Sequence, residues 1–332
     1  MALPDVLARP LTVPVVGSPL FICSGPELVM AQCQAGIIGS FPALNARPAS
    51  ALADWLDRIN AGNAAYAAAN PSATVAPFAV NQIVHRSNDR LEHDMAVIVE
   101  HRVPIVITSL GARPEINDAV HSYGGIVLHD VIDNAFARKA IEKGADGIIA
   151  VAAGAGGHAG VQSPFALVQE IREWFDGPLL LSGAIAHGRS VLAALAAGAD
   201  FAYVGSAFLS TTEANADPGY KQMIVDSSAK DIVYSNLFTG VHGNYLRGSI
   251  VAAGLDPNNL PESDPSAMDF GSGGNMKIKA WKDVWGSGQG VGAITRSLTV
   301  AELVAQFKSQ YEDALNRLDV RTATPERVAQ SA

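Results

Sequence analysis

The sequence contains little cysteine. Its 332 residues include only two cysteines, Cys23 and Cys33, which form neither a CxxC pair nor a cluster with histidines. This spacing excludes a disulfide framework and a structural zinc site, so we predict no metal. Free cysteines of this kind are typical of a reducing compartment, and we therefore expect the protein to be cytoplasmic.

Charged residues are also scarce, at 17% of the chain, and they leave a net charge of -9. General nucleic-acid binders and proteins of anionic membranes need surfaces rich in Lys and Arg. We therefore expect a small-molecule substrate as the partner, with no nucleic acid and no membrane. The oligomeric state stays open, with a homodimer as one option.

Long apolar runs of the kind that enter membranes are missing. Prolines interrupt the first residues, where a signal peptide needs an unbroken apolar core. The most apolar long stretch, 191–209, carries Asp200 and two glycines. Such a stretch favours a buried helix, turn and strand over a bilayer span.

Short apolar segments are abundant in the chain. Apolar residues make up 48% of the chain, and β-rich runs alternate with helical patterns, which is typical of successive βα units. Eight runs are predicted as strands: 19–24, 36–41, 75–80, 104–110, 125–131, 147–153, 178–184 and 201–207. Most are apolar on both faces, as strands of a (β/α)8 TIM barrel are.

Two helix starts have recognisable signals. The residues from Ser24 to Glu27 have the spacing of a capping box. Ser163 precedes Pro164, which predicts a serine cap followed by proline in the first helical position.

The alternation of strand and helix patterns stops after the eighth predicted strand. We predict that 213–295 form a helical and loop insertion, a lid subdomain over the active site. Within it, Trp281 and Trp285 have helical spacing and are expected to bury one helix face. Residues 1–212 and 296–320 are predicted to form the barrel and its closing helix.

The loops after the seventh and eighth predicted strands are built for an anion. Phosphate often binds these two loops of a TIM barrel, and small residues let backbone N–H groups approach it. The alternative is that they serve only as turns. The residues are Ser182, Gly183, Ala184, Gly205 and Ser206.

A glycine-rich segment, "AAGAGGHAGV" (152–161), places one histidine among almost bare backbone. It fits the G-x-G-x-x-A form of a dinucleotide fingerprint, but that motif belongs in the first βα turn and this segment follows a sixth strand. We interpret the bare backbone as a wall for a flat ligand ring. His158 then projects at the active-site end, where imidazole transfers protons or stabilises a developing anion. The alternative is a histidine that only hydrogen-bonds backbone.

Several segments together resemble the nitronate monooxygenase family, formerly called 2-nitropropane dioxygenases. The resemblance spans nearly the whole chain and is specific for the family but weak for substrate. It is carried by "PLFICSGPELVMAQCQAGIIGSF", "GAGGHAG", "LLLSGAIAHGRSVLAALAAGADFAYVGSAFLSTTEA", "DIVYSNLFTGVHGNYLR" and "SGQGVGAI".

The resemblance implies a TIM barrel that binds FMN and oxidises alkyl nitronates with O2 to a carbonyl compound and nitrite. His158 would be the active-site histidine, which hydrogen-bonds the nitro group or takes the α-proton of a neutral nitroalkane. Asn81 would contact the flavin, and Gly156 and Gly157 would lie near the ring. Ile22, Cys23 and Ser24 would border the isoalloxazine, and the five small residues named above would hold the phosphate.

The sequence departs from the family at three of these places, one of which is the first predicted strand, where "ICSG" stands in place of the Gly/Pro-Met sequence that is common in relatives. Ala184 stands where relatives often have a second glycine, which is tolerable if its φ is negative. Where some relatives place a lysine near the flavin, this chain has His129 and Asp130. His129 is therefore our choice for the positive charge beside the reduced flavin.

Two other functions stay open. Enoyl reductases and NADH:quinone reductases that use flavin share these motifs, so the alternative enzyme is an NAD(P)H-dependent flavin reductase acting on a quinone or enoyl thioester. The third hypothesis is a protein that binds a flavin or phosphate without turnover, with a structural His158. Cys23 as a redox thiol is weighed against simple packing, and packing is favoured because it has no partner cysteine.

Overall fold

The structure is a computed structural model, and it describes residues 3–263 and 281–322. Eight parallel strands form one sheet, which a bridge from Val16 to Ile38 closes into a barrel. The predicted TIM barrel is thus confirmed. Its strands are β1 (Val15–Gly17), β2 (Gly39–Pro42), β3 (Phe78–Ile83), β4 (Ile105–Ser109), β5 (Ile126–Val131), β6 (Gly147–Val151), β8 (Leu179–Ser182) and β9 (Phe201–Val204).

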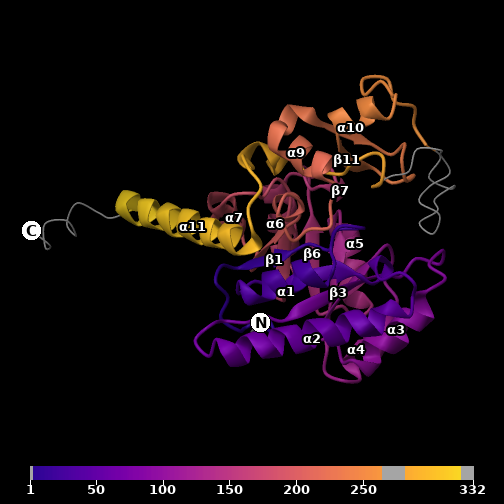
Figure 1. The fold of residues 1–332 in the computed structure, drawn as a ribbon, viewed down its shortest axis with the longest axis vertical. Helices are drawn as coiled ribbons and strands as arrows, with labels where there is room; N and C mark the ends of the chain where they lie inside the picture. The colour runs from indigo at the N-terminus through magenta and orange to yellow at the C-terminus, as the bar shows by residue number, and fades with distance from the viewer. Residues whose placement is uncertain (1–2, 264–280, 323–332) are drawn as a thin grey trace, which may run out of the picture.

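Helices surround the barrel and alternate with its strands (Figure 1). The last of them, α11, packs against α7 and extends to one side of the barrel. None of the helices among the described residues has the length and apolar character needed to cross a bilayer. They are α1 (Pro26–Gln34), α2 (Ala51–Ala69), α3 (Leu91–Glu100), α4 (Pro114–His121), α5 (Asn134–Glu142), α6 (Pro164–Arg172), α7 (Gly188–Ala196), α8 (Ser206–Leu209) and α11 (Val300–Thr322).

The first predicted strand was wrong. The strand is Val15–Gly17, which pairs with β9, whereas residues 20–24 form a turn in which the N–H groups of Cys23 and Ser24 donate to the Leu20 carbonyl. Val15 and Val16 are buried, but Ile22 in the turn is 38% exposed. Ile22 therefore lies at the surface although Cys23 of the same run packs in the core, and periodicity alone does not separate such a turn from a strand.

Both predicted helix starts are present, without the predicted caps. α1 begins at Pro26 after Gly25, and neither Gly25 nor Ser163 caps its helix with a side-chain hydrogen bond. The Ser24 hydroxyl instead accepts from the Leu20 N–H at 2.9 Å. The serine thus stabilises the turn after β1 rather than the helix.

The buried apolar side chains of the strands form two layers, one on each face of the sheet. One layer fills the barrel and includes Ile107, Leu128 and Ile149. The other lies between sheet and helices and includes Val127 and Val131. Because strand side chains alternate between faces, these layers show which polar residues point into the barrel mouth.

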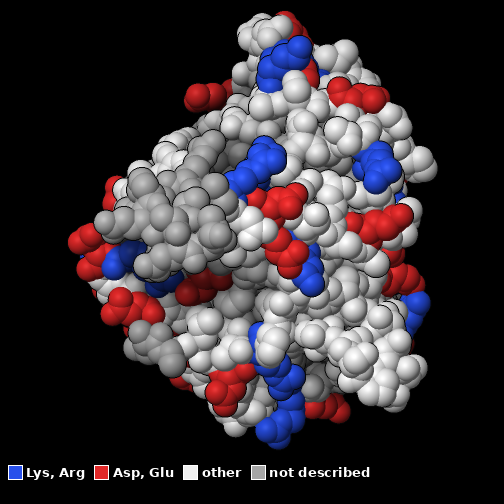
Figure 2. All heavy atoms as spheres, turned by 90° about the vertical axis from the view of Figure 1, so that its left-hand side faces the viewer, with Lys and Arg blue, Asp and Glu red and all other residues white. Residues whose placement is uncertain are grey.

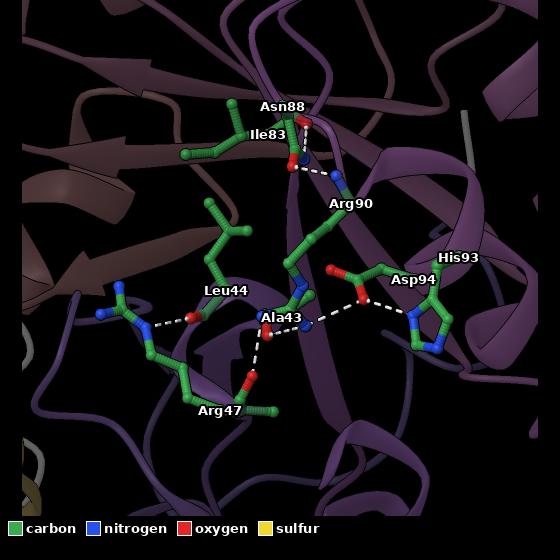
Figure 3. A network of polar contacts seen from close by, with 9 residues as sticks. Ala43, Leu44, Arg47, Ile83, Asn88, Arg90, His93 and Asp94 are labelled. Carbon is green, nitrogen blue, oxygen red and sulfur yellow. Dashed lines mark hydrogen bonds and ion pairs between the residues drawn. The ribbon is translucent and has the colours of Figure 1, made fainter. Parts of the chain in front are cut away.

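A buried ion pair ties α3 to the loop after β2 (Figure 3). Arg90 Nη2 lies 2.9 Å from Asp94 Oδ1, and Asp94 is 0% exposed. The same guanidinium donates to the carbonyls of Ala43 and Ala46, at 3.3 and 2.7 Å. It thereby holds the turn η1 (Ala43–Asn45) in place. Asn45 of this turn hydrogen-bonds the Ile22 N–H at the barrel mouth.

The insertion lies over one end of the barrel (Figure 1). It has its own apolar cluster, which includes Phe238, Tyr245 and Trp281. We predicted helix and loop, but a three-stranded sheet is present in which β11 pairs with β10 and with β7 (Gly157–His158) of the glycine-rich segment. The insertion comprises α9 (Pro218–Asp226), η2 (Ala229–Asp231), β10 (Ile232–Ser235), β11 (Gly243–Leu246), α10 (Arg247–Ala252) and η4 (Gln289–Ala293).

The helix predicted for Trp281 and Trp285 is also wrong. Residues 281–283 form a turn, and 284 and 286 form bridges. Trp285 stacks on Tyr220 with ring centroids 4.9 Å apart, whereas Trp281 reaches the glycine-rich segment. Residues 264–280 of the predicted lid lie outside the described part of the chain.

Charged side chains of both signs are interspersed on the face that Figure 2 shows.

Candidate active site

His158 lies where the barrel and the insertion meet. It opposes Gly243 in the antiparallel pair of β7 and β11. Its Nε2 lies 2.9 Å from the Thr239 hydroxyl, and the Trp281 ring meets the imidazole edge-on with centroids 5.6 Å apart. Burial lowers the pKa of His158 to about 4, so the ring is neutral at pH 7.

The glycines beside His158 pack closely against residues 281–288 of the same chain. A Cβ on Gly156 would lie 2.8 Å from the Gly288 nitrogen, and one on Gly157 would lie 3.1 Å from the Trp281 ring. Gly157 also has a φ of 70°. At these positions bare backbone is needed for contacts with 281–288, and the predicted flavin contact of Gly156 and Gly157 stays a prediction.

Asn244 of β11 fixes this arrangement. Its side-chain amide donates to the Ala155 carbonyl at 2.7 Å, and its main-chain carbonyl accepts from the Ser287 N–H at 3.1 Å. The Gly288 N–H then donates to the Ser206 hydroxyl at 2.9 Å. The glycine-rich segment is thereby held between the insertion and the end of β9. Sequence reasoning missed Asn244, Thr239 and the contact of Trp281, because no local pattern links them to residue 158.

A chain of polar side chains crosses the mouth at the ends of β3, β4 and β5. The Asn81 amide donates to the Ser109 hydroxyl at 2.7 Å and to the Ile107 carbonyl at 3.1 Å. Ser109 in turn donates to Asp130 Oδ2 at 2.5 Å. Burial raises the pKa of Asp130 to about 6, although the Ser109 hydrogen bond opposes the shift. The sequence prediction assigned no role to Asp130 and selected its neighbour His129.

His129 points away from the mouth. Leu128 lies in the barrel interior and Val127 on the helix side, so alternation places His129 on the helix side and Asp130 inside. His129 Nδ1 lies 2.6 Å from the Thr108 hydroxyl, and burial lowers its pKa to about 4. The expected positive charge at His129 is therefore wrong, since the ring is neutral and on the other face.

The turn after β1 holds a strained apolar residue at the surface. Ile22 has a φ of 69°, which is rare for a β-branched residue. Asn45 of η1 accepts from the Ile22 N–H at 2.8 Å and donates to the carbonyls of Leu20 and Ser24. Cys23 is buried, and burial raises the pKa of its thiol to about 11. Cys23 is therefore a packed thiol rather than a reactive thiolate.

The predicted phosphate loops follow β8 and β9. Ser182 ends β8 and Gly205 precedes α8. One predicted donor group is engaged within the protein, because the Ala184 N–H donates to the Gly154 carbonyl at 3.1 Å. The Ser206 hydroxyl accepts from the Gly288 N–H, and this bond does not use its own hydrogen. Ala184 has a φ of 54°, so the condition under which a methyl group is tolerable at this residue is not met.

Replacing Ala184 by glycine is expected to stabilise the protein. An alanine with positive φ is strained by about 1 kcal/mol, and glycine removes that strain. We expect the free energy of unfolding, measured by urea denaturation, to rise by about 0.5–1 kcal/mol. The control is Ala186→Gly, a buried position nearby, which should lower it. A loss of stability in Ala184→Gly equal to that of the control would refute this assignment of strain.

Comparisons with known proteins agree with this architecture. The nitroalkane oxidase of Streptomyces ansochromogenes has a similar structure, with a TM-score of 0.78 at 23% identity over 95% of this chain and 100% of that one. FabK of Thermotoga maritima gives a TM-score of 0.75 at 22% identity, over 96% and 97% of the chains. At this identity the similarity shows the fold alone.

Sequence comparison is more specific. A nitronate monooxygenase of Paraburkholderia phytofirmans is 33% identical over 189 residues, which cover 53% of this chain and 51% of the relative. A probable nitronate monooxygenase of Bacillus subtilis is 28% identical over 187 residues, 50% of this chain and 52% of the relative. The chain thus spans about half the length of these relatives. The family model described as nitronate monooxygenase matches residues 40–309, and the chain therefore belongs to the nitronate monooxygenase family.

Proposed function

We propose that the protein binds FMN at the barrel mouth and uses O2 to oxidise alkyl nitronates to a carbonyl compound and nitrite. The observation that carries this proposal is the position of His158. A neutral imidazole stands at the junction of barrel and insertion, in a chain of the nitronate monooxygenase family.

The residues at the mouth fit a flat ring with a phosphate. Asn81 uses both amide hydrogens within the protein, leaving its amide oxygen to accept from a ring N–H. Ile22 supplies an exposed apolar edge. The small residues after β8 and β9 allow a phosphate to approach the backbone. When bound, FMN would accept electrons from the substrate and pass them to O2.

The neutral state of His158 favours nitronates over neutral nitroalkanes. A group with a pKa of about 4 is a weak base at neutral pH, so it is poorly suited to removing an α-proton. A neutral imidazole N–H is well suited to donating a hydrogen bond to an anionic nitro group. We assign that role to His158, and we assign residues 213–295 the role of covering the pocket, because their sheet includes β7.

The test begins with the visible spectrum of the purified protein and the identity of the flavin released from it. Addition of ethylnitronate in air should consume O2 and produce nitrite and acetaldehyde. Steady NADH oxidation with a quinone or an enoyl thioester, without nitrite from nitronates, would decide for the alternative reductase. Protein that binds no flavin when FMN is supplied would refute the whole mechanism.

A further inference from the structure

The Tyr245 hydroxyl is a buried polar group without a hydrogen bond. Tyr245 is 0% exposed, and its ring contacts Phe238 and Trp281 with centroids 4.8 and 5.6 Å apart. Its hydroxyl makes no hydrogen bond in the structure. A buried hydroxyl without a partner destabilises the fold, so phenylalanine would be the more stable residue here unless the hydroxyl is used in another state of the protein.

The Tyr245 hydroxyl lies close to the strand pair that holds His158, because a Cβ on Gly243, the residue opposite His158, would be 3.2 Å from it. Burial raises the pKa of Tyr245 to about 12 and the Thr239 side chain opposes the shift, as a neighbouring hydroxyl does, although the two groups do not meet in hydrogen-bond geometry. Thr239 is also the hydrogen-bond partner of His158. Trp281 contacts both His158 and Tyr245, so all these groups belong to one cluster.

The Thr239 hydroxyl already makes all three hydrogen bonds that a hydroxyl can make. A hydroxyl has one hydrogen to donate and two lone pairs that accept. Thr239 donates to the Val241 carbonyl at 3.0 Å and accepts from the Val241 N–H at 3.3 Å. The remaining lone pair, 2.9 Å from His158 Nε2, accepts the imidazole N–H. This leaves Tyr245 no place on Thr239, and it assigns the proton of the neutral imidazole to Nε2.

We propose that Thr239 and Tyr245 are positioning residues that let His158 exchange its hydrogen bond. Without a ligand, Thr239 holds His158 as the Nε2–H tautomer. When an anionic nitro compound accepts the Nε2 hydrogen, one lone pair of Thr239 is released, and the Tyr245 hydroxyl donates to it. The new bond at Tyr245 offsets the one that His158 gives up. This inference rests on the proposed function only in taking the ligand of His158 to be an anionic nitro compound.

The tautomer is tested in the protein without substrate. In 15N-labelled protein, NMR distinguishes the protonated from the unprotonated imidazole nitrogen, and the His158 signals are those missing in His158→Gln. We expect a protonated Nε2 in the wild type, loss of this preference in Thr239→Val and its return in Thr239→Ser. A protonated Nδ1 in the wild type, or an unchanged tautomer in Thr239→Val, would overturn the role of Thr239.

The exchange is tested with nitrite as the probe, on the protein as purified. Binding to the wild type should shift the His158 Nε2 signal. Tyr245→Phe should raise the nitrite dissociation constant about fivefold, without lowering the free energy of unfolding and without changing the tautomer in the absence of nitrite. The matched control is Tyr234→Phe, which removes a hydroxyl that bonds the Ala159 carbonyl at 3.0 Å and should leave nitrite affinity unchanged.

The results separate this inference from the proposed function. An unchanged nitrite affinity in Tyr245→Phe, or no nitrite-dependent shift of His158 in the wild type, would overturn the exchange even if nitronates are oxidised. Conversely, the tautomer and the effect of Tyr245→Phe on nitrite affinity are measured without turnover. They can therefore hold even if no nitronate is consumed.

Discussion

Replacement of His158 by alanine is expected to lower kcat/KM for ethylnitronate by about 10²–10³-fold, because it removes one hydrogen-bond donor from the anionic substrate. The flavin content should be retained, since Asn81 and the small residues after β8 and β9, to which we assign FMN, lie outside the segment that carries His158. Initial rates of O2 consumption and nitrite formation measure the effect.

His242→Ala is the matched control. His242 is exposed and lies in the insertion near His158, with its ring stacked on Tyr234. We expect this variant to keep the wild-type rate. Full activity in His158→Ala with bound FMN would favour the reading of His158 as a structural residue.

The pH profile gives a further check on the state of His158. Because burial lowers the pKa of His158 to about 4, the ring stays neutral as the pH rises from 6 to 9. The kcat/KM of the free enzyme for a nitronate should therefore show no step from His158 in this range. A rise in kcat/KM with an apparent pKa near 6.5 that disappears in His158→Gln would contradict the neutral assignment.

Replacement of Gly288 by alanine is expected to displace the glycine-rich segment. A Cβ there would lie 2.5 Å from the Gly154 carbonyl oxygen and 2.9 Å from the Gly156 nitrogen, and both are backbone atoms. Gly288 has a φ of -90°, so alanine meets no conformational strain and the effect is purely steric. We expect the free energy of unfolding to fall by about 1–3 kcal/mol and nitronate oxidation to fall more than about tenfold, because a 1 Å displacement near reacting groups is costly.

Gly292→Ala in the same segment is the matched control. Its Cβ would meet only Ser228, at 3.8 Å or more. Alanine should therefore leave activity unchanged and stability equal or slightly higher. Urea denaturation and the nitrite assay compare the two variants. If Gly288→Ala behaves like Gly292→Ala, the close packing of 286–289 on the glycine-rich segment is not required for the site.

The positions of the barrel strands were largely predictable from the sequence, but the face on which each side chain lies was not. Seven of the eight barrel strands and their order follow from the alternation of apolar and helical segments, but the face of each side chain depends on register. A single-residue step decided that Asp130 and not His129 faces the mouth. The turn at 20–24 was mistaken for a strand because an apolar residue at a mouth and one in a core look alike in sequence.

The sequence by itself determined the barrel, the family and the place of His158 after the sixth barrel strand, because these depend on local periodicity and on short motifs. Only the tertiary structure decided what surrounds that histidine. Thr239, Asn244, Tyr245 and Trp281 come from the insertion and reach the segment at 154–158 through pairing of β11 with β7 and through packing. Contacts between residues so far apart are fixed by the folding of the whole chain, and no local pattern records them.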